Sequence, residues 1–284
     1  MISMAGKAIR KWWALFALPT FAAFIIGFVI PFIMGVYLSF CKFTTVTDSE
    51  FIGLKNYQKA LADKEFLHAL GFSTALTIVT TVVINVVAFA IAYMLTKAIK
   101  GSNIFRSVFF MPNLIGGIIL GYIWMLLLNG ILAHWGRALT YSATYGFWGL
   151  VILVCWQQIG YMMIIYIAGI QNIPGELIEA AKIDGCSYYT IFTKIIFPLM
   201  GPINATIAIL TALWAWNDFL LPLITLTDQS NQTIPLAQYV FQSQFTSNYP
   251  MAFASYLMAM APVLIVYVFA QKWVVGGVMR GAVK

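Results

Sequence analysis

The chain has 284 residues, of which 62% are hydrophobic and 9% are charged, and its formal net charge is +7. This composition excludes a soluble globule, because so little polar surface cannot keep a chain of this length in water. The basic excess does not indicate nucleic-acid binding, since Lys and Arg lie scattered at the ends of hydrophobic runs and form no stripe with interleaved aromatics.

Cysteine and histidine spacing indicates neither a disulfide framework nor a metal site. Cys41, Cys155 and Cys186 lie far apart, and His68 and His134 are isolated from any set of residues with ligand spacing. No G-x-x-x-x-G-K-[ST] phosphate loop and no nucleophile motif occurs. We therefore expect no enzyme active site, no metal and no cofactor bound by this chain.

Six hydrophobic runs are long enough to cross a bilayer, because about 20 residues of helix span a hydrocarbon core of roughly 30 Å. The first run resembles a signal peptide, but it is too long and lacks a convincing small-residue cleavage site, so we expect it to remain as a span. We predict an all-α membrane protein with a single transmembrane domain over residues 1–284. Its six transmembrane helices are expected near 13–40, 71–96, 104–129, 146–170, 200–226 and 250–276.

Basic residues predict the orientation of the spans. With the N-terminus inside, the cytoplasmic segments contain most of the 16 Lys and Arg residues. The outer loops contain only Lys42, Lys55, Lys59, Lys64 and Arg137. The positive-inside rule therefore predicts that both termini are cytoplasmic.

Residues 174–198, between the fourth and fifth spans, predict a short helix, a turn and a second helix on the cytoplasmic face. Pro174 and Gly175 mark the start, and acidic residues in the first turns favour the helix dipole. Gly185 permits a sharp turn because it has no side chain. An interfacial helix that only links two spans would show the same apolar face, which consists of Ile178, Ala181, Tyr188, Phe192 and Ile195.

The spacing within this segment is more specific than its amphipathicity. The segment resembles the EAA loop of bacterial ABC importer permeases, whose pattern is EAA-x3-G-x9-I-x-L-P. It has EAA at 179–181, three intervening residues before Gly185, and IIFP at 195–198. Only Phe197 departs from that pattern, in which Leu is usual. The rest of the chain resembles the carbohydrate, maltose-type branch of this family, with 51–70 and 106–130 similar to one partner of a permease pair and 214–223 and 276–284 similar to the other.

The resemblance implies that the short helix is a coupling helix, which docks in a cleft of a separate ATP-binding subunit. The residues expected to act there are Glu179, Ala180, Ala181, Asp184 and Gly185. The two alanines suit close docking because their side chains are small, and Glu179 can pair with an Arg of the partner. Asp184 fits a turn contact within this chain equally well.

Polar residues in two spans are candidates for a substrate pathway, because sugars need fixed hydrogen-bond partners and a flat apolar surface. Side chains of this kind are costly facing lipid and should point inward. Their positions resemble the helices that line the sugar site of maltose-type permeases, although hydrogen bonds between helices explain them equally well. The candidates are Gln157, Gln158 and Tyr161 in the fourth span and Trp216, Asn217 and Asp218 in the fifth. For Asn85 we expect a bond between helices.

The family resemblance implies import of a sugar, with an oligosaccharide favoured and glycerol phosphate as an alternative substrate. It also implies the partners: a second, non-identical permease subunit, two ATP-binding subunits that hold ATP and Mg, and an extracytoplasmic sugar-binding protein that contacts the polar loop 228–250. The expected location is the bacterial cytoplasmic (inner) membrane. An ion-coupled secondary transporter is the alternative from another class, but Asp218 is the only carboxylate expected deep in the spans.

Overall fold

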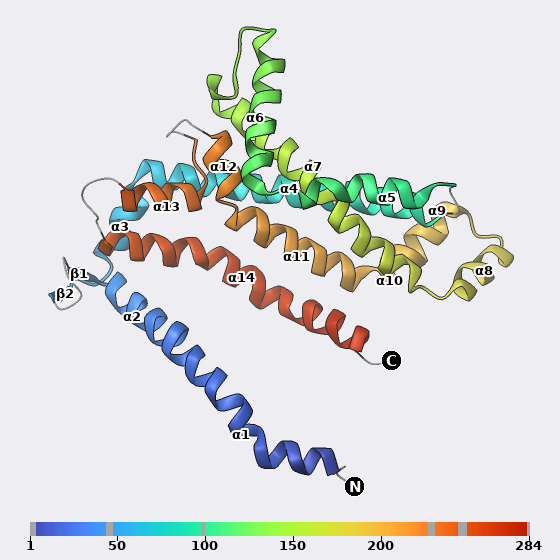
Figure 1. Ribbon diagram of the computed structural model, residues 1–284, viewed down its shortest axis with the longest axis horizontal. Helices are drawn as coiled ribbons and strands as arrows, with labels where there is room; N and C mark the ends of the chain where they lie inside the picture. Colours follow the sequence, from blue (N-terminus) through green and yellow to red (C-terminus); the bar gives the residue numbers. More distant parts are fainter. Residues whose placement is uncertain (1–3, 44–47, 98–99, 227–230, 244–248, 283–284) are drawn as a thin grey trace. The chain divides into compact units, whose positions relative to one another are not determined.

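The computed structural model describes residues 4–43, 48–97, 100–226, 231–243 and 249–282, which fall into two compact units (Figure 1). One unit contains the residues up to Asp63 together with Val240–Met258. The other contains Lys64–Tyr239 and the residues from Ala259 onward. Each unit has its own internal packing and is described by itself.

The first unit begins with helix α1 (Met4–Phe24), a π-helical turn η1 (Ile25–Val29) and helix α2 (Ile30–Ser39). The π turn lies directly before Pro31, whose missing N–H interrupts the regular hydrogen-bond ladder. Strands β1 (Cys41–Phe43) and β2 (Ser49–Phe51) then pair antiparallel, with Lys42 opposite Glu50, and helix α3 (Lys55–Ala62) follows.

A buried asparagine joins α3 to the end of the first span. The Asn56 amide donates hydrogen bonds of 2.9 Å to the carbonyls of Ser39 and Cys41, and the hydroxyls of Tyr57 and Ser39 lie 2.7 Å apart. The bond to Ser39 satisfies a carbonyl that the end of α2 would otherwise leave without a partner, and the bond to Cys41 reaches the first strand of the hairpin. The hairpin and α3 are therefore anchored to the end of α2.

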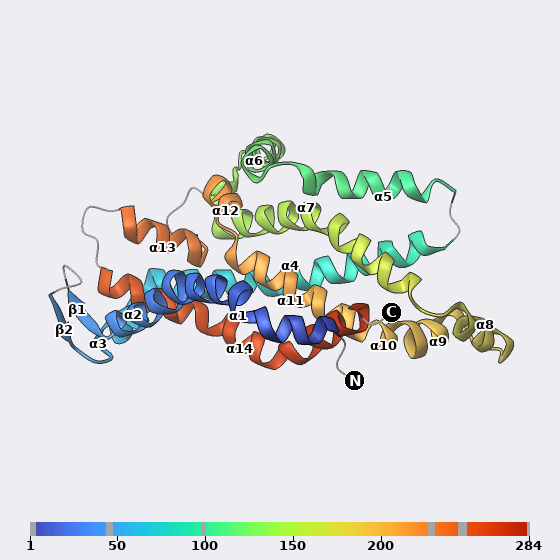
Figure 2. The same ribbon diagram turned by 60° about the horizontal axis from the view of Figure 1, so that its bottom comes forward.

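The second unit is a helical bundle in which α4 (Lys64–Thr96) packs against α7 (Ala143–Gln171) and α11 (Gly201–Asn217). Figure 2 shows α7 between α5 (Ser102–Phe110) on one side and α4 and α11 on the other. The remaining elements are η2 (Met111–Leu114), α6 (Gly117–Ala133), η3 (Leu139–Tyr141), α8 (Gly175–Ile183), α9 (Tyr188–Ile191), η4 (Phe192–Ile196), α10 (Phe197–Leu199), α12 (Leu220–Thr225), α13 (Ile234–Ser243) and α14 (Tyr249–Ala282), of which α13 and α14 extend into both units.

Helix α4 is apolar on all sides, but only one of its faces packs against other helices. Leu76, Ile84 and Ala88 are almost completely buried against α7 and α11, whereas Ile78 and Val82 are each 57% exposed. Because the exposed face is as apolar as the buried one, the helix suits a surrounding hydrocarbon solvent. Gly160 of α7 allows an equally close contact on another side, since a Cβ there would collide with the carbonyl oxygen of Phe109 in α5.

The all-α membrane fold predicted from the sequence is confirmed. Four of the described helices are long and apolar enough to cross a membrane without interruption: Trp12–Ser39, Lys64–Thr96, Ala143–Gln171 and Tyr249–Phe269. Two further pairs are bent, and if each pair counts as one span the described chain has six.

The span predicted over 104–129 consists of two helices that meet at a bend. The segments Ser102–Leu114 and Gly117–Ala133 meet at an angle of 100°, because Pro112 cannot donate a backbone hydrogen bond and Ile115 and Gly116 adopt extended backbone angles. The fifth span also differs from the expected 200–226. A bend of 66° separates Tyr188–Leu199 from Gly201–Asn217, and α11 ends at Asn217, before α12 begins at Leu220.

Candidate functional site: a polar pocket and an exposed elbow

A pocket of about 280 Å³ opens in the second unit where two helix breaks meet. Gly117 comes from the break before α6, and Asp218 lies between α11 and α12. Irregular backbone at membrane depth is tolerated where it lines a cavity, because water or a ligand can then satisfy the freed polar groups. The residues that line the pocket are Ile84, Gly117, Val154, Gln157, Gln158, Thr211, Trp214, Ala215, Asn217, Asp218, Leu220 and Leu221.

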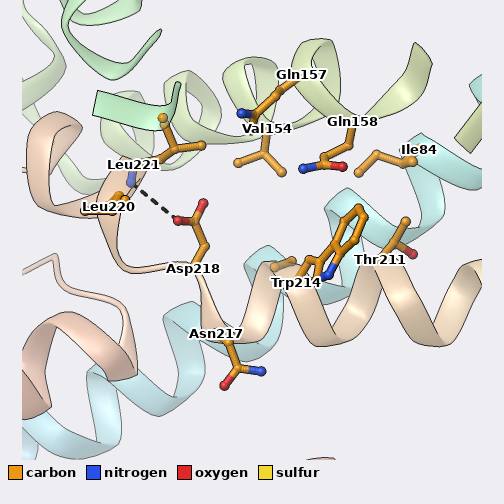
Figure 3. Close-up of a pocket in the computed structure, with 12 residues that line it drawn as sticks. Ile84, Val154, Gln157, Gln158, Thr211, Trp214, Asn217, Asp218, Leu220 and Leu221 are labelled. Atoms are coloured by element: carbon orange, nitrogen blue, oxygen red, sulfur yellow. Dashed lines mark hydrogen bonds between the residues drawn. The ribbon is translucent and has the colours of Figure 1, made fainter. Parts of the chain in front are cut away.

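Two side chains that can form hydrogen bonds with a ligand, Gln158 and Asp218, face the interior of this pocket (Figure 3). The side chain of Gln158 points from α7 toward the side of the pocket formed by α11, and its Oε1 is buried with no hydrogen-bond partner among the described residues. Asp218 points from the end of α11 toward α7, and its Oδ1 accepts a 3.4 Å hydrogen bond from the N–H of Leu221. Trp214 adds a half-exposed indole beside them.

Sequence reasoning selected Trp216 for this site, but the structure places that residue elsewhere. Trp216 is buried among Ala69, Ile234 and Ala259, and its indole N–H donates a 3.2 Å hydrogen bond to the carbonyl of Ala259 in α14. Trp214 lines the pocket instead.

Helical spacing was the signal that could have found the pocket-lining tryptophan. Thr211 and Trp214 are three residues apart and therefore share one face of α11, and Asp218 follows Trp214 by four residues just beyond the end of the helix. Trp216 is two residues from both Trp214 and Asp218, which places it on the other side of the helix.

The remaining predicted pathway residues occupy different positions. Gln157 lines the pocket beside Gln158. Tyr161 is not among the lining residues, but the centroid of its ring lies 5.5 Å from that of Trp214, so the two rings pack together. Asn217 borders the pocket, yet its side chain points away from Gln158 and donates a 2.8 Å hydrogen bond to the carbonyl of Leu213 (Figure 3).

The second candidate region is the short helix α8 with the turn that follows it, at one end of the second unit (Figures 1 and 2). Gly185 has a φ of 75°, which an L side chain rarely adopts. The N–H of Cys186 donates to the carbonyl of Ala181, and the N–H of Gly185 donates to the carbonyl of Lys182. This pair of bonds is the Schellman motif, which ends α8 sharply at Asp184.

The predicted coupling residues divide between the outer and inner faces of this elbow. Glu179, Ala180, Asp184 and Gly185 are exposed. Ala181 is only 7% exposed and packs in the core of its own unit. Sequence reasoning did not single out Ile183, which is 86% exposed at the tip and leaves an apolar side chain uncovered.

Helices of membrane length that enclose a polar pocket at two helix breaks define a multi-pass membrane transport protein. Residues 100–280 match the family described as the binding-protein-dependent transport system inner membrane component, and the chain belongs to that family. Proteins of this family are permease subunits, whose ATPase site is on a separate subunit. An ion-coupled secondary transporter is thereby set aside.

Two relatives carry sugar-transport names. The Probable starch degradation products transport system permease protein AmyD of Thermoanaerobacterium thermosulfurigenes is 41% identical over 199 residues, which are 67% of this chain and 68% of that protein. The Multiple sugar-binding transport system permease protein MsmG of Streptococcus mutans is 34% identical over 264 residues, which are 90% of this chain and 92% of that protein.

A solved structure shares the fold. One chain of a bacterial ABC transporter that imports the acidic polysaccharide alginate superposes with a TM-score of 0.75 at 19% identity, covering 95% of this chain and 98% of that one. The same kind of transporter in complex with an alginate pentasaccharide-bound periplasmic protein gives a TM-score of 0.74 at 20% identity.

Proposed function

We propose that this chain is a permease subunit of an ATP-driven importer of sugars, with an oligosaccharide as the favoured substrate. The observation that carries the proposal is the pocket in which Gln157, Gln158 and Asp218 lie beside the indole of Trp214. Amides, a carboxylate and a flat aromatic face are the groups that bind sugar hydroxyls and pyranose faces. The sugar-transport names of AmyD and MsmG support the same substrate class.

The pathway in this proposal consists of Gln157, Gln158, Trp214 and Asp218, with Tyr161 holding the indole in place. Asn217 contributes to the rim of the pocket. Trp216 is left out, because a side chain buried against α14 cannot reach a ligand in the pocket.

The elbow at the end of α8 is proposed as the contact with the ATP-binding subunit. Glu179 presents a carboxylate next to the small, exposed side chain of Ala180. Gly185 sets the direction in which the chain continues after α8. Ala181 joins the elbow to the bundle instead of docking, since it packs in the core of its own unit. A push on α8 would therefore reach the core of the bundle through Ala181.

The proposed assembly contains a second, non-identical permease, two ATP-binding subunits that hold ATP and Mg, and an extracytoplasmic sugar-binding protein. Two pairs of relatives, AmyD with AmyC and MsmG with MsmF, each from a single organism, support a paired permease. The membrane is the bacterial inner membrane, with the elbow and both termini on the cytoplasmic side, as the distribution of Lys and Arg favours. The outer loop 228–250, of which 231–243 and 249–250 are described, is the proposed contact with the binding protein.

Uptake by the complete importer in proteoliposomes tests this proposal. Wild-type uptake of sugar should require ATP and persist in the presence of a proton uncoupler. Glu179→Arg or Gly185→Pro should abolish uptake while the chain still inserts and assembles, because docking fails but the bundle still packs. Glu50→Arg, an equal charge change on the hairpin of the other unit, should leave uptake unchanged. If uptake persisted in both Glu179→Arg and Gly185→Pro, the elbow would not be the contact with the ATP-binding subunit.

A further inference from the structure

The polar pocket carries only one kind of charge. Asp218 is the sole ionisable side chain among the described residues that line it, and no Lys, Arg or His is present there. The surrounding positions are apolar or uncharged, including Ile84, Val154 and Leu220. A carboxylate in such surroundings is poorly screened by solvent, so its field acts strongly on anything that enters the pocket.

Both side chains that face the interior offer an acceptor, and the Gln158 amide also carries N–H donors. Gln158 Oε1 is buried without a partner among the described residues, and Asp218 uses part of its capacity on the N–H of Leu221. A buried acceptor without a donor is costly, so a ligand that donates hydrogen bonds is favoured. Sugar hydroxyls donate, whereas ionised carboxylate and phosphate groups only accept.

We infer that this pocket admits uncharged, hydroxyl-donating sugars and rejects sugars that carry carboxylate or phosphate groups, with Asp218 as the residue that excludes anions. The inference rests on the proposed function and narrows its substrate class. An anionic group next to Asp218 would meet a like charge with no cation in the lining to compensate. Glycerol phosphate is thereby disfavoured.

Binding to the complete transporter in lipid nanodiscs tests the inference without the selection imposed by the binding protein. The two probes are a glucose trisaccharide and the same trisaccharide with each C6 hydroxymethyl group oxidised to a carboxylate. Saturation-transfer NMR titrations at neutral pH report the affinity of each. The wild-type transporter should bind the neutral trisaccharide about tenfold or more tightly than the oxidised one.

Four variants test whether Asp218 causes the difference in affinity between the neutral and the oxidised trisaccharide. Asp218→Asn should bring the two affinities close together while the neutral trisaccharide still binds, which also shows that the variant folds. Asp218→Lys should reverse the preference, because it places a cation in the pocket. Gln158→Leu should weaken the neutral trisaccharide because an acceptor is lost. Glu50→Gln, which removes a negative charge from the hairpin of the other unit, is the matched control and should leave the ratio unchanged.

The outcomes separate this inference from the proposed function. Equal binding of both trisaccharides by the wild type, or an unchanged ratio in Asp218→Asn, overturns the inference but leaves a sugar permease. Binding of neither trisaccharide, together with no ATP-dependent uptake of any sugar, overturns both.

Discussion

The phenol of Tyr166 in α7 donates a 2.7 Å hydrogen bond to Oδ1 of Asn85 in α4, and the Asn85 amide donates a 3.1 Å hydrogen bond to Thr211 Oγ1 in α11. Three helices from distant parts of the chain are thus joined through one asparagine. The expectation that Asn85 bonds helix to helix is confirmed. In an apolar bundle such a bond specifies how the helices are rotated against one another.

Tyr166→Phe should therefore destabilise the protein by about 1 kcal/mol, because it leaves the Asn85 carbonyl oxygen without its donor. Thermal unfolding in detergent, followed by the loss of the monodisperse elution peak, measures the effect. Tyr267→Phe is the matched control, since that tyrosine is 50% exposed on α14. Equal melting temperatures for both variants would show that the hydrogen bond contributes nothing.

Gly160→Ala should be among the most damaging small substitutions in the chain. The added methyl group would collide with the carbonyl of Phe109, a backbone atom that cannot rotate away, so we expect a loss of about 3 kcal/mol or failure to assemble. Gly71→Ala in α4 meets nothing within 4 Å and should be neutral or slightly stabilising. The same thermal assay compares them, and a tolerated Gly160→Ala would contradict the close approach of α5 and α7.

Gly185→Ala should affect coupling more than stability. An alanine at φ 75° costs about 1 kcal/mol, which is enough to shift the turn without unfolding the bundle. In proteoliposomes we expect slower sugar uptake with ATP hydrolysis no longer matched to it. Gly175→Ala, at the start of α8 with no positive φ and no close neighbour, serves as the control. If both alanines left the ratio of uptake to hydrolysis at the wild-type value, the geometry of the elbow would not matter.

The two nearby tryptophans of α11 should give opposite phenotypes. Trp214→Ala should weaken sugar binding about tenfold with an unchanged melting temperature, because its half-exposed ring lines the pocket. Trp216→Ala should cost about 3 kcal/mol of stability, because it empties a buried site and removes the hydrogen bond to Ala259. Paired measurements of affinity and melting temperature distinguish the roles, and the reverse pattern would show that the pocket has been assigned to the wrong face.

Several features were accessible to sequence reasoning because their causes are local. The turn at Gly185 follows from the absence of a side chain, and its Schellman bonds join residues no more than five positions apart. The membrane-length helices follow from runs of apolar residues, which need no knowledge of their neighbours. The break near Pro112 is also local, but the sequence does not determine its angle, because a proline can either kink a membrane helix or end it.

The sequence by itself determined that this is an all-α membrane protein with a sharp elbow between two of its spans, since composition, helix length and glycine geometry act within a few residues. Only the tertiary structure decided that Trp214 and not Trp216 lines the pocket, that Ala181 faces the bundle, and that Asn85, Tyr166 and Thr211 meet. Helices that are apolar on all sides give little sign of which face turns inward. That choice depends on contacts between residues far apart in the chain.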